Sequence, residues 1–361
     1  MAAPIIGEKE KQLIAEVLDS RMLASGKYAE EFEKQFANYC GAKFATANVN
    51  GTASLHTALL ALGIKEGDKV ATTAFSFIAT ANSILFCGAK PIFIDINPET
   101  FNMNLDLLEA RLKKEKNIKA VIIVHLYGLM SDMDRLLALK KKYKFKLIED
   151  CAQSHGAKYK GKKAGSFGDA SAFSFYATKN IMTGEGGMVL TNDVKTDKAA
   201  KQIINHGRDG HSTFTILGYN FRMTNLSAAI GIAQLSQLEE WIEKRNANAA
   251  KYNEAFKDLD FLQIPITFEN YRHVFHQYTL RIKGGQRNKF MQYLKDKEVG
   301  CGIYYDTAMY RQPFYKKLGY KAGLCPQAEK AAKEVLSIPV HPSLSSEDTN
   351  KIIEIIKEYK K

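Results

Sequence analysis

The alternation of strand-like and helical segments constrains the fold of this chain more than any other feature of its sequence. Up to about residue 205, short apolar runs alternate with segments of helical periodicity. This alternation is typical of a mostly parallel sheet with helices on both faces. Runs such as Val121-Ile122-Ile123-Val124 are apolar throughout, which indicates strands buried on both sides. The sequence predicts seven strands, at 44–49, 69–74, 91–95, 120–125, 145–149, 171–175 and 188–191, and helices at 54–62, 79–86, 105–112 and 132–143.

The last third of the chain has a different pattern. A helical pattern without proline extends from residue 225 to about 259 and changes from an apolar to a charged half, so we expect it to lead out of the first domain. A strand near 276–282 and helices near 287–297 and 347–358 then suggest a small α+β unit.

The chain length agrees with two domains. Its 361 residues are many for one hydrophobic core and few for three. We predict an α/β protein with a large α/β/α domain at residues 1–237, built on a mostly parallel seven-stranded sheet, and a smaller C-terminal α+β domain at residues 238–361. No apolar run approaches the ~20 residues that span a bilayer, and the N-terminus lacks the apolar segment of a signal peptide. We therefore expect a cytoplasmic protein with no membrane partner.

Charge and cysteine content exclude several functional classes. The net charge of +12 is explained either by a lysine-rich solvated surface or by attraction for an anionic substrate or nucleic acid. The sequence contains no helix-turn-helix, zinc-finger or RNA-binding signature, so nucleic acid is not expected as a partner. The five cysteines are widely spaced and include no C-x-x-C pair, which argues against a disulfide framework and a zinc site. We expect no metal.

Two segments, 148–156 and 173–187, carry the clearest chemical signal. Lys179 follows an apolar strand, where burial would lower the pKa of its amine and make it a nucleophile toward an aldehyde. Asp150 ends another strand, at the edge where open α/β sheets bind ligands. Pyridoxal phosphate needs such an amine for a Schiff base and such a carboxylate beside its pyridine nitrogen. Spacing alone also permits a lysine that snorkels from a strand end and an aspartate that caps a loop. Glu149 should point to the opposite side of the strand.

Other residues are candidates for holding the cofactor phosphate and ring. Gly51 and Thr52 lie between a strand and a helix, where free backbone N–H groups bind anions. The alternative is a simple N-cap by Asn50 or Thr52. Ser174 can add a hydroxyl near Lys179. Phe77 is a candidate to stack on the pyridine ring, although aromatic residues at strand ends also pack in cores.

Three further polar residues are candidates. Gln153 can donate a hydrogen bond to the phenolic oxygen of the cofactor. If the segment 218–223 is extended, Asn220 and Arg222 project to one side and offer an amide and a guanidinium to a phosphate or carboxylate. The alternative for this segment is a solvent-facing loop.

With these motifs assembled, the sequence resembles the DegT/DnrJ/EryC1/StrS family of pyridoxal-phosphate-dependent nucleotide-sugar aminotransferases, which have fold type I. The likeness covers nearly the whole chain, through segments at 25–26, 50–53, 75–82, 88–91, 125–128, 149–156, 173–187, 218–230 and 336–340.

The resemblance implies a role for each matching residue. Lys179 would bond covalently to the cofactor, with Asp150 at the pyridine nitrogen and Gln153 beside the phenolic oxygen. The phosphate would be held by Gly51, Thr52 and Ser174, together with Asn220 of a neighbouring subunit. The family forms homodimers with shared active sites, so we expect a homodimer here.

The resemblance also implies a reaction. An amino group from L-glutamate would be transferred to a keto group, at C3 or C4, of a nucleotide-linked deoxy sugar, to give an amino sugar for a surface glycan or a related product. Related sugar dehydratases carry histidine at the position of Lys179, so the lysine favours amino transfer. The segment 303–310 departs from the family pattern near the sugar. We predict substrate contacts from Arg222, Tyr304, Tyr305 and Tyr310. The alternatives are another fold type I reaction on amino acids, or a basic DNA-binding regulatory protein.

Overall fold

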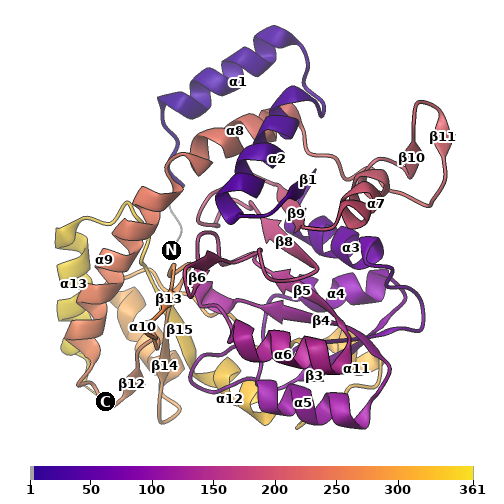
Figure 1. The fold of residues 1–361 in the computed structure, drawn as a ribbon. Helices are drawn as coiled ribbons and strands as arrows, with labels where there is room; N and C mark the ends of the chain where they lie inside the picture. The colour runs from indigo at the N-terminus through magenta and orange to yellow at the C-terminus, as the bar shows by residue number, and fades with distance from the viewer. Residues whose placement is uncertain (1–3, 361) are drawn as a thin grey trace.

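A seven-stranded sheet forms the centre of the larger part of the molecule (Figure 1). The computed structural model describes residues 4–360, and its strand order is β1-β9-β8-β5-β4-β2-β3. Only β9 runs against the other six strands. The predicted mostly parallel sheet is therefore confirmed. Its strands are β1 (Phe44–Asn48), β2 (Lys69–Thr73), β3 (Lys90–Ile94), β4 (Ile118–Val124), β5 (Lys146–Asp150), β8 (Ala170–Ser174) and β9 (Gly187–Thr191).

Helices cover both faces of this sheet because successive strand residues point to opposite sides. In β4, Val121 and Ile123 belong to one core and Ala120 and Ile122 to another. The first core lies under α2 (Lys27–Cys40), α5 (Leu105–Lys114), α6 (Met133–Tyr143) and α8 (Asn225–Leu235), and the second under α3 (Gly51–Ala61) and α4 (Ala79–Phe86). The three layers match the predicted α/β/α domain.

The C-terminal part has its own core around a three-stranded antiparallel sheet of order β12-β14-β15. Figure 1 shows α9 and α13 along the outer side of this sheet. The elements that form this core are α9 (Leu238–Phe256), β12 (Leu262–Gln263), β14 (Tyr278–Ile282), α10 (Arg287–Asp296), β15 (Val335–Ile338) and α13 (Ser346–Lys357).

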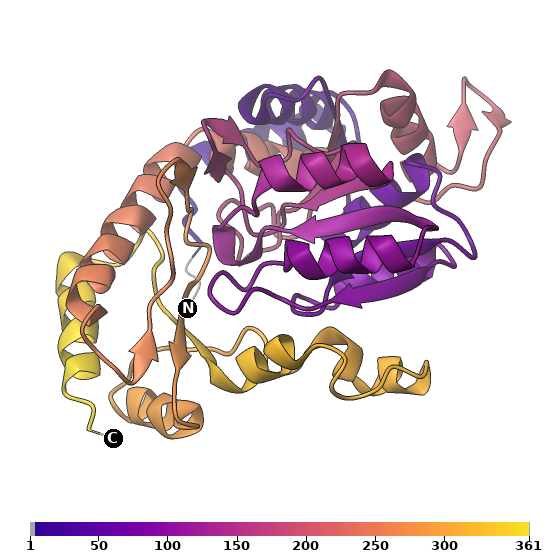
Figure 2. The same ribbon diagram turned by 60° about the horizontal axis from the view of Figure 1, so that its bottom comes forward.

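The division at residue 237 stays a prediction, because the two parts share elements. On α9, Trp241 and Ile242 pack in the core of the large sheet, whereas Tyr252 and Phe256 pack in the C-terminal core. The segment with η2 (Met309–Arg311), α11 (Pro313–Lys317) and α12 (Pro326–Glu334) packs against the large domain, and Figure 2 shows it extending along that domain.

The single helix predicted from residue 225 to about 259 is wrong. The structure has two helices, α8 and α9, with a break at Ser236 and Gln237. The side chains of Gln234 and Gln237 both donate to Oε1 of buried Glu10, at 2.7 and 3.2 Å. This contact with the N-terminal helix is tertiary, so the local sequence gives no proline or glycine signal for it.

The remaining elements are short or peripheral. A small sheet joins β13 to β6 and β7, and a hairpin of β10 and β11 projects from the body (Figure 1). None of the helices in the described part of the chain combines the length and the apolar character that crossing a bilayer requires. The bounds of these remaining elements are α1 (Glu8–Ser20), β6 (Lys158–Tyr159), β7 (Lys162–Lys163), α7 (Val194–Ile204), β10 (Arg208–Asp209), β11 (Thr213–Phe214), β13 (Tyr271–Arg272) and η1 (Leu126–Gly128).

Candidate active site

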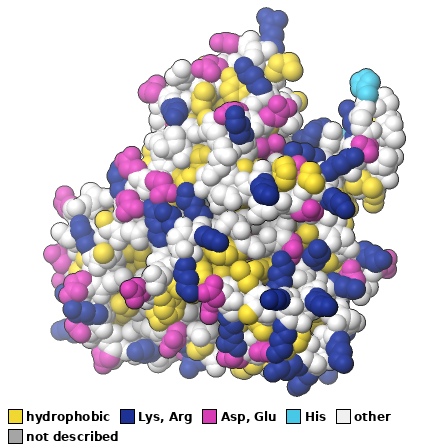
Figure 3. All heavy atoms as spheres, viewed as in Figure 1, with side chains coloured by type: hydrophobic (Ala, Val, Ile, Leu, Met, Phe, Trp, Pro, Cys, Tyr) yellow, Lys and Arg dark blue, Asp and Glu magenta, His cyan; other side chains and the backbone are white. Residues whose placement is uncertain are grey.

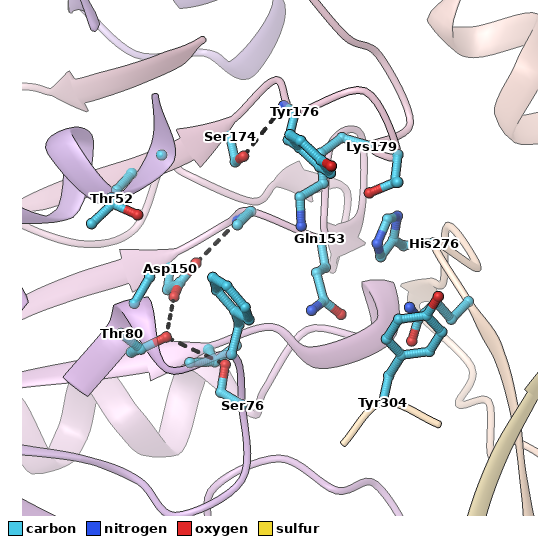
Figure 4. Close-up of a pocket in the computed structure, with 18 of the residues that line it drawn as sticks. Thr52, Ser76, Thr80, Asp150, Gln153, Ser174, Tyr176, Lys179, His276 and Tyr304 are labelled. Atoms are coloured by element: carbon cyan, nitrogen blue, oxygen red, sulfur yellow. Dashed lines mark hydrogen bonds between the residues drawn. The ribbon is translucent and has the colours of Figure 1, made fainter. Parts of the chain in front are cut away.

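A cavity of about 870 Å³ lies at the carboxyl ends of β4, β5 and β8. Parallel strands bring their loops together at this edge, where α/β proteins bind ligands. Segments of the C-terminal part complete the wall. Figure 4 shows Thr52, Asp150 and Ser174 on one side of the cavity and His276 and Tyr304 on the other. Among the predicted site residues, those that line it are Gly51, Thr52, Phe77, Asp150, Gln153, Ser174, Lys179, Tyr304 and Tyr305.

Lys179 lies in the loop between β8 and β9 and is half-buried. Burial lowers the pKa of its amine to about 8, although the negative charge of Asp150 opposes the shift. Such an amine is neutral in about one molecule in ten at pH 7, far more often than an ordinary lysine. It can attack an aldehyde or accept a proton, which an ordinary surface lysine does poorly.

Asp150 is buried at the end of β5 and faces the cavity. Its carboxylate accepts hydrogen bonds from the Thr80 hydroxyl at 2.8 Å and from the Ala152 N–H at 3.1 Å. Burial raises the pKa of Asp150, while Thr80, Ala152 and Lys179 oppose the increase. The protonated ring nitrogen of a ligand beside this carboxylate would give Asp150 a partner of opposite charge where little water reaches it.

The first turn of α3 forms an anion cradle against the end of β8. The Asn50 side chain caps the helix by accepting from the Ala53 N–H at 2.8 Å, so the N-cap interpretation is correct. The N–H groups of Gly51 and Thr52 come before that of Ala53 in the first turn of α3, and both residues line the cavity. A Cβ on Gly51 would lie 2.6 Å from the Cβ of Ser174, so only glycine permits this approach. The cap and the cradle therefore coexist.

Gln153 and Tyr305 form a polar pair in the cavity wall. Nε2 of Gln153 donates to the Tyr305 hydroxyl at 3.1 Å, and its Oε1 accepts from the Tyr127 N–H at 2.8 Å. The Tyr127 hydroxyl in turn donates to the carbonyl oxygen of Tyr304. These bonds tie the segment of Tyr304 and Tyr305, from the C-terminal part, to the edge of the large sheet.

Phe77 is 57% exposed, which excludes the core alternative. Its ring lies 6.2 Å from that of Tyr305, and both line the cavity. The amine, the carboxylate, the anion cradle and this aromatic edge surround one space, so these residues fit pyridoxal phosphate. The role of each residue toward the cofactor stays a prediction.

Two predicted site residues lie outside the cavity of their own chain. Asn220 is exposed, and its backbone pairs with Asn205 next to α7. Nη1 of Arg222 donates to Oδ1 of Asn205 at 2.7 Å. Neither residue is among those lining the cavity of the described chain.

The structure does not place Tyr310 at the cavity, contrary to the predicted substrate contact. Its side chain is fully buried, and its hydroxyl donates to Oε1 of Glu329 at 2.6 Å and accepts from the Cys325 N–H at 2.9 Å. The chain turns into η2 at Met309, which directs Tyr310 into the core between α12 and β3. Tyr310 therefore supports the fold.

Sequence reasoning missed several residues that line the cavity, chiefly Thr80, Arg245 and His276. Thr80 looks like an ordinary residue at the start of a helix. Arg245 lies within a run of charged helix residues, where the usual expectation is solvent exposure. His276 begins a predicted strand, and only the tertiary fold brings it to Lys179.

Glu149 belongs to a separate buried cluster. Its ligand atoms and those of His125 and Cys151 lie within 4.8 Å of one another, as metal ligands would. However, the carboxylate already accepts from His125 Nε2 and from the N–H groups of residues 165, 167 and 168, at 2.8 to 3.1 Å. These hydrogen bonds stabilise the buried carboxylate of Glu149, so this residue supports the fold. All five cysteines are unpaired.

Comparisons with known proteins agree with this geometry. A model of the DegT/DnrJ/EryC1/StrS aminotransferase family matches residues 4–357. The chain is 40% identical over 359 residues to the "Pleiotropic regulatory protein" of Geobacillus stearothermophilus, with 98% of this chain and 95% of that protein covered. It is 38% identical over 362 residues to the GDP-perosamine synthase of Caulobacter vibrioides, with 98% and 96% covered. The solved structure of DesV from S. venezuelae, in complex with a ketimine intermediate, is similar with a TM-score of 0.94, 30% identity and coverage of 97% and 94%.

Proposed function

Because the chain belongs to the DegT/DnrJ/EryC1/StrS aminotransferase family, we propose that it uses pyridoxal phosphate to move the amino group of L-glutamate onto a nucleotide-linked keto deoxy sugar. The keto group is at C3 or C4, and the product is an amino sugar for a surface glycan or a related compound. The observation that carries the proposal is the amine of Lys179, with a pKa lowered to about 8, in one cavity with the buried carboxylate of Asp150.

Each residue around the cavity has a role in this proposal. Bound pyridoxal phosphate would supply a ring that withdraws the negative charge left when a proton departs from the neighbouring carbon. Asp150 holds the ring nitrogen protonated, and Gln153 donates to the phenolic oxygen. The α3 cradle of Gly51 and Thr52, with the Ser174 hydroxyl, binds the phosphate.

Lys179 moves the protons. Its neutral amine would accept the proton that leaves the nitrogen-bearing carbon of the amino donor and would later give that proton up. A pKa of about 8 suits both directions, because such an amine takes up and gives up a proton more readily near neutral pH than an ordinary lysine does. Phe77 flanks the ring and limits access of water to it.

We further propose that the active unit is a homodimer in which Asn220 of one subunit reaches the phosphate of the other. Asn220 is exposed and lies away from the cavity of its own chain. The large apolar side chains of Phe77 and Tyr176 line the cavity and are 57% and 47% exposed, as residues that a second subunit covers would be.

Mixing two inactive variants tests this shared site. A hybrid of Lys179→Ala and Asn220→Asp subunits contains one site with both native residues only if Asn220 acts across the interface. We expect activity to return on mixing and refolding. If Asn220 acts within its own chain, every hybrid site lacks one residue and the mixture stays inactive.

The substrate proposal rests on chemistry at the cavity mouth and on charge. Tyr304 and Tyr305 offer hydroxyl groups to a sugar, and Arg222 offers a guanidinium to a diphosphate across the dimer. The net charge of +12 favours an anionic nucleotide sugar. Figure 3 shows basic side chains spread over the visible face with acidic ones among them, which does not resemble a nucleic-acid-binding stripe.

An absorption spectrum and an assay of 2-oxoglutarate release distinguish this proposal from a regulatory protein and from an enzyme that acts on amino acids. The purified protein should carry an absorption band from the bond between Lys179 and the cofactor, which borohydride removes and Lys179→Ala lacks. A regulatory protein without cofactor chemistry would have no such band after reconstitution. An enzyme for amino acids would have the band but would release no 2-oxoglutarate from L-glutamate in response to keto sugars. We propose that the protein acts in the cytoplasm.

A further inference from the structure

His56 is a buried histidine that the proposed chemistry does not use. It lies in the second turn of α3, and its side chain is 5% exposed. Burial lowers the pKa of the ring, so the ring is neutral near pH 7. Its buried Nε2 has no hydrogen-bond partner within residues 4–360, and such a nitrogen costs free energy. What His56 contributes therefore comes from the surface of its ring and not from Nε2.

The ring of His56 packs against two aromatic rings of the segment 218–223. Its centroid lies 5.0 Å from that of Tyr219 and 6.1 Å from that of Phe221. The rings of Tyr219 and Phe221 are stacked on each other, with centroids 4.7 Å apart. Side chains two residues apart in an extended segment share one face, and the residue between them points the other way. The contact with His56 therefore directs the exposed side chain of Asn220 away from α3.

Backbone bonds join the same segment to the turn that carries the anion cradle. The Val49 N–H donates to the carbonyl oxygen of Phe221 at 2.7 Å, and Asn48 forms a β-bridge with Arg222. Both bonds lie directly before the first turn of α3. A second bridge joins Asn220 to the residue that ends α7, and α7 packs beside α3 (Figure 1). The end of β1, α3 and the segment 218–223 therefore form one unit within a chain.

We propose that His56 is a positioning residue whose ring holds Asn220 in place for the cofactor phosphate of the other subunit. This inference rests on the proposed homodimer with shared sites. In such a dimer, the anion cradle of a chain binds the phosphate of its own site, and Asn220 binds that of the partner. An amide bonds a phosphate oxygen only at about 2.7–3.2 Å, so a displaced segment loses this bond. His56 therefore acts on the site of the neighbouring subunit.

Two forms of the cofactor distinguish positioning from general stability. Pyridoxal phosphate and pyridoxal both bond to Lys179, but only the first carries a phosphate. Titration of cofactor-free protein, followed by the absorption band of this bond, gives both affinities. In His56→Ala we expect the Kd for pyridoxal phosphate to rise about tenfold, the factor for loss of a hydrogen bond to a charged group. The Kd for pyridoxal should stay within about twofold of the wild type.

Three further variants serve as controls. His56→Phe keeps an aromatic ring and should bind both forms within about twofold of the wild type. Leu108→Ala removes a fully buried side chain from the opposite face of the sheet, so it controls for lost stability and should not change either affinity. If His56→Ala does not fold, Phe221→Leu removes the ring contact from the other side and should weaken the binding of pyridoxal phosphate but not that of pyridoxal.

Hybrid dimers show on which subunit His56 acts. In the first hybrid, one chain carries both Lys179→Ala and His56→Ala, and its wild-type partner contains the only site that bonds the cofactor. In the second hybrid, one chain carries Lys179→Ala and the other His56→Ala, so the bond forms in the chain without the His56 ring. We expect weakened binding of pyridoxal phosphate in the first hybrid. The second should bind within about twofold of a hybrid with Lys179→Ala alone.

The outcomes distinguish this inference from the proposed function. The inference is overturned if the weakening occurs in the second hybrid instead of the first, because His56 would then act on its own anion cradle. It is also overturned if pyridoxal loses as much affinity as pyridoxal phosphate, or if neither affinity changes, even where the hybrid of Lys179→Ala and Asn220→Asp is active. If that hybrid is inactive, the shared site fails. If His56 acts across the dimer but no keto sugar is aminated, the proposed function fails and the positioning role stands.

Discussion

Glu149 and Asp150 are consecutive buried carboxylates on β5 that serve opposite faces of the sheet. Glu149 accepts hydrogen bonds from His125 and from backbone N–H groups of the loop before β8. Asp150 accepts from Thr80 and the Ala152 N–H and faces the cavity. Burial would raise the pKa of Glu149, but the bonds from His125 and the backbone outweigh burial and lower it, whereas burial dominates and raises the pKa of Asp150. One carboxylate therefore stabilises the fold, and the other is held ready for a cationic ligand.

Glu149→Gln should destabilise the protein by roughly 2–4 kcal/mol, because the charged acceptor of several buried hydrogen bonds is lost. The folded-state pKa of Glu149 is below its unfolded value, so its stabilisation is complete above the unfolded pKa and is lost as the pH falls through the folded pKa. Urea unfolding should show a large difference from the wild type at neutral pH and a smaller one in acid. An equal difference at both pH values would contradict this role.

Asp150→Asn should affect the stability of the protein in the opposite direction from Glu149→Gln. Because the folded-state pKa of Asp150 is raised, the carboxylate costs stability at neutral pH, and the amide should leave the cofactor-free protein equally or more stable. Amino transfer should fall by at least about 100-fold, as expected for loss of a group that controls protonation of the reacting system. Unfolding curves and initial rates measure the two effects. A strongly destabilised but active Asp150→Asn would reverse the assigned roles.

Lys179 should react with the cofactor according to a pKa near 8. Its amine is a nucleophile only when neutral, so the rate at which cofactor-free protein takes up pyridoxal phosphate should rise as the pH increases through about 8. Absorbance after mixing gives this rate, and Lys179→Ala should form no covalent bond. Lys198→Ala, at an exposed lysine paired with Asp209, is the control. A midpoint near the ordinary lysine value of about 10.4 would show that burial does not lower this pKa.

Gly51→Ala should weaken cofactor binding by about tenfold or more. The new Cβ would lie 2.6 Å from the Cβ of Ser174, so α3 must move away from β8 and its first N–H groups must leave the phosphate position. Equilibrium titration of cofactor-free protein with pyridoxal phosphate measures the affinity. In Gly7→Ala the nearest atom would be 3.5 Å from the new Cβ, and affinity should not change. Equal affinities of the wild type, Gly51→Ala and Gly7→Ala for pyridoxal phosphate would rule out phosphate binding by the first turn of α3.

Tyr305→Phe should weaken substrate binding, whereas Tyr310→Phe should reduce the stability of the fold. Tyr305 lines the cavity, so loss of its hydroxyl should raise the KM for the keto sugar severalfold with little change in stability. Tyr310 is buried and bonds Glu329 and Cys325, so its hydroxyl should contribute about 1–3 kcal/mol to stability and nothing to KM. Thermal unfolding and steady-state kinetics on both variants would contradict the structure if the effects were exchanged.

The sequence predicts much of the sheet because its strands are marked locally. The apolar run around Val121, the position of Asp150 at the end of one strand and that of Lys179 in the loop after another follow from patterns of a few residues. At the break between α8 and α9, Gln234 and Gln237 bond the distant Glu10, and the buried Tyr310 bonds Glu329. No local pattern encodes such contacts.

Arg245 illustrates the same limit at the site. In sequence it is one charge in a charged helix, yet the fold places it in the cavity wall without a carboxylate partner within residues 4–360. The periodicity of α9 cannot separate this residue from its solvent-exposed neighbours, because α9 passes from one core to the other. Only the packing of both parts around the cavity identifies it.

The most direct test of the account follows the nitrogen atom. Purified holoenzyme is incubated with nitrogen-labelled L-glutamate and a panel of C3 and C4 keto nucleotide sugars, and the products are analysed by mass spectrometry. The account predicts label in one amino sugar, equimolar 2-oxoglutarate, and neither product with Lys179→Ala. Unlabelled sugars throughout, from an enzyme that carries its cofactor and transfers the label to another class of acceptor, would contradict it.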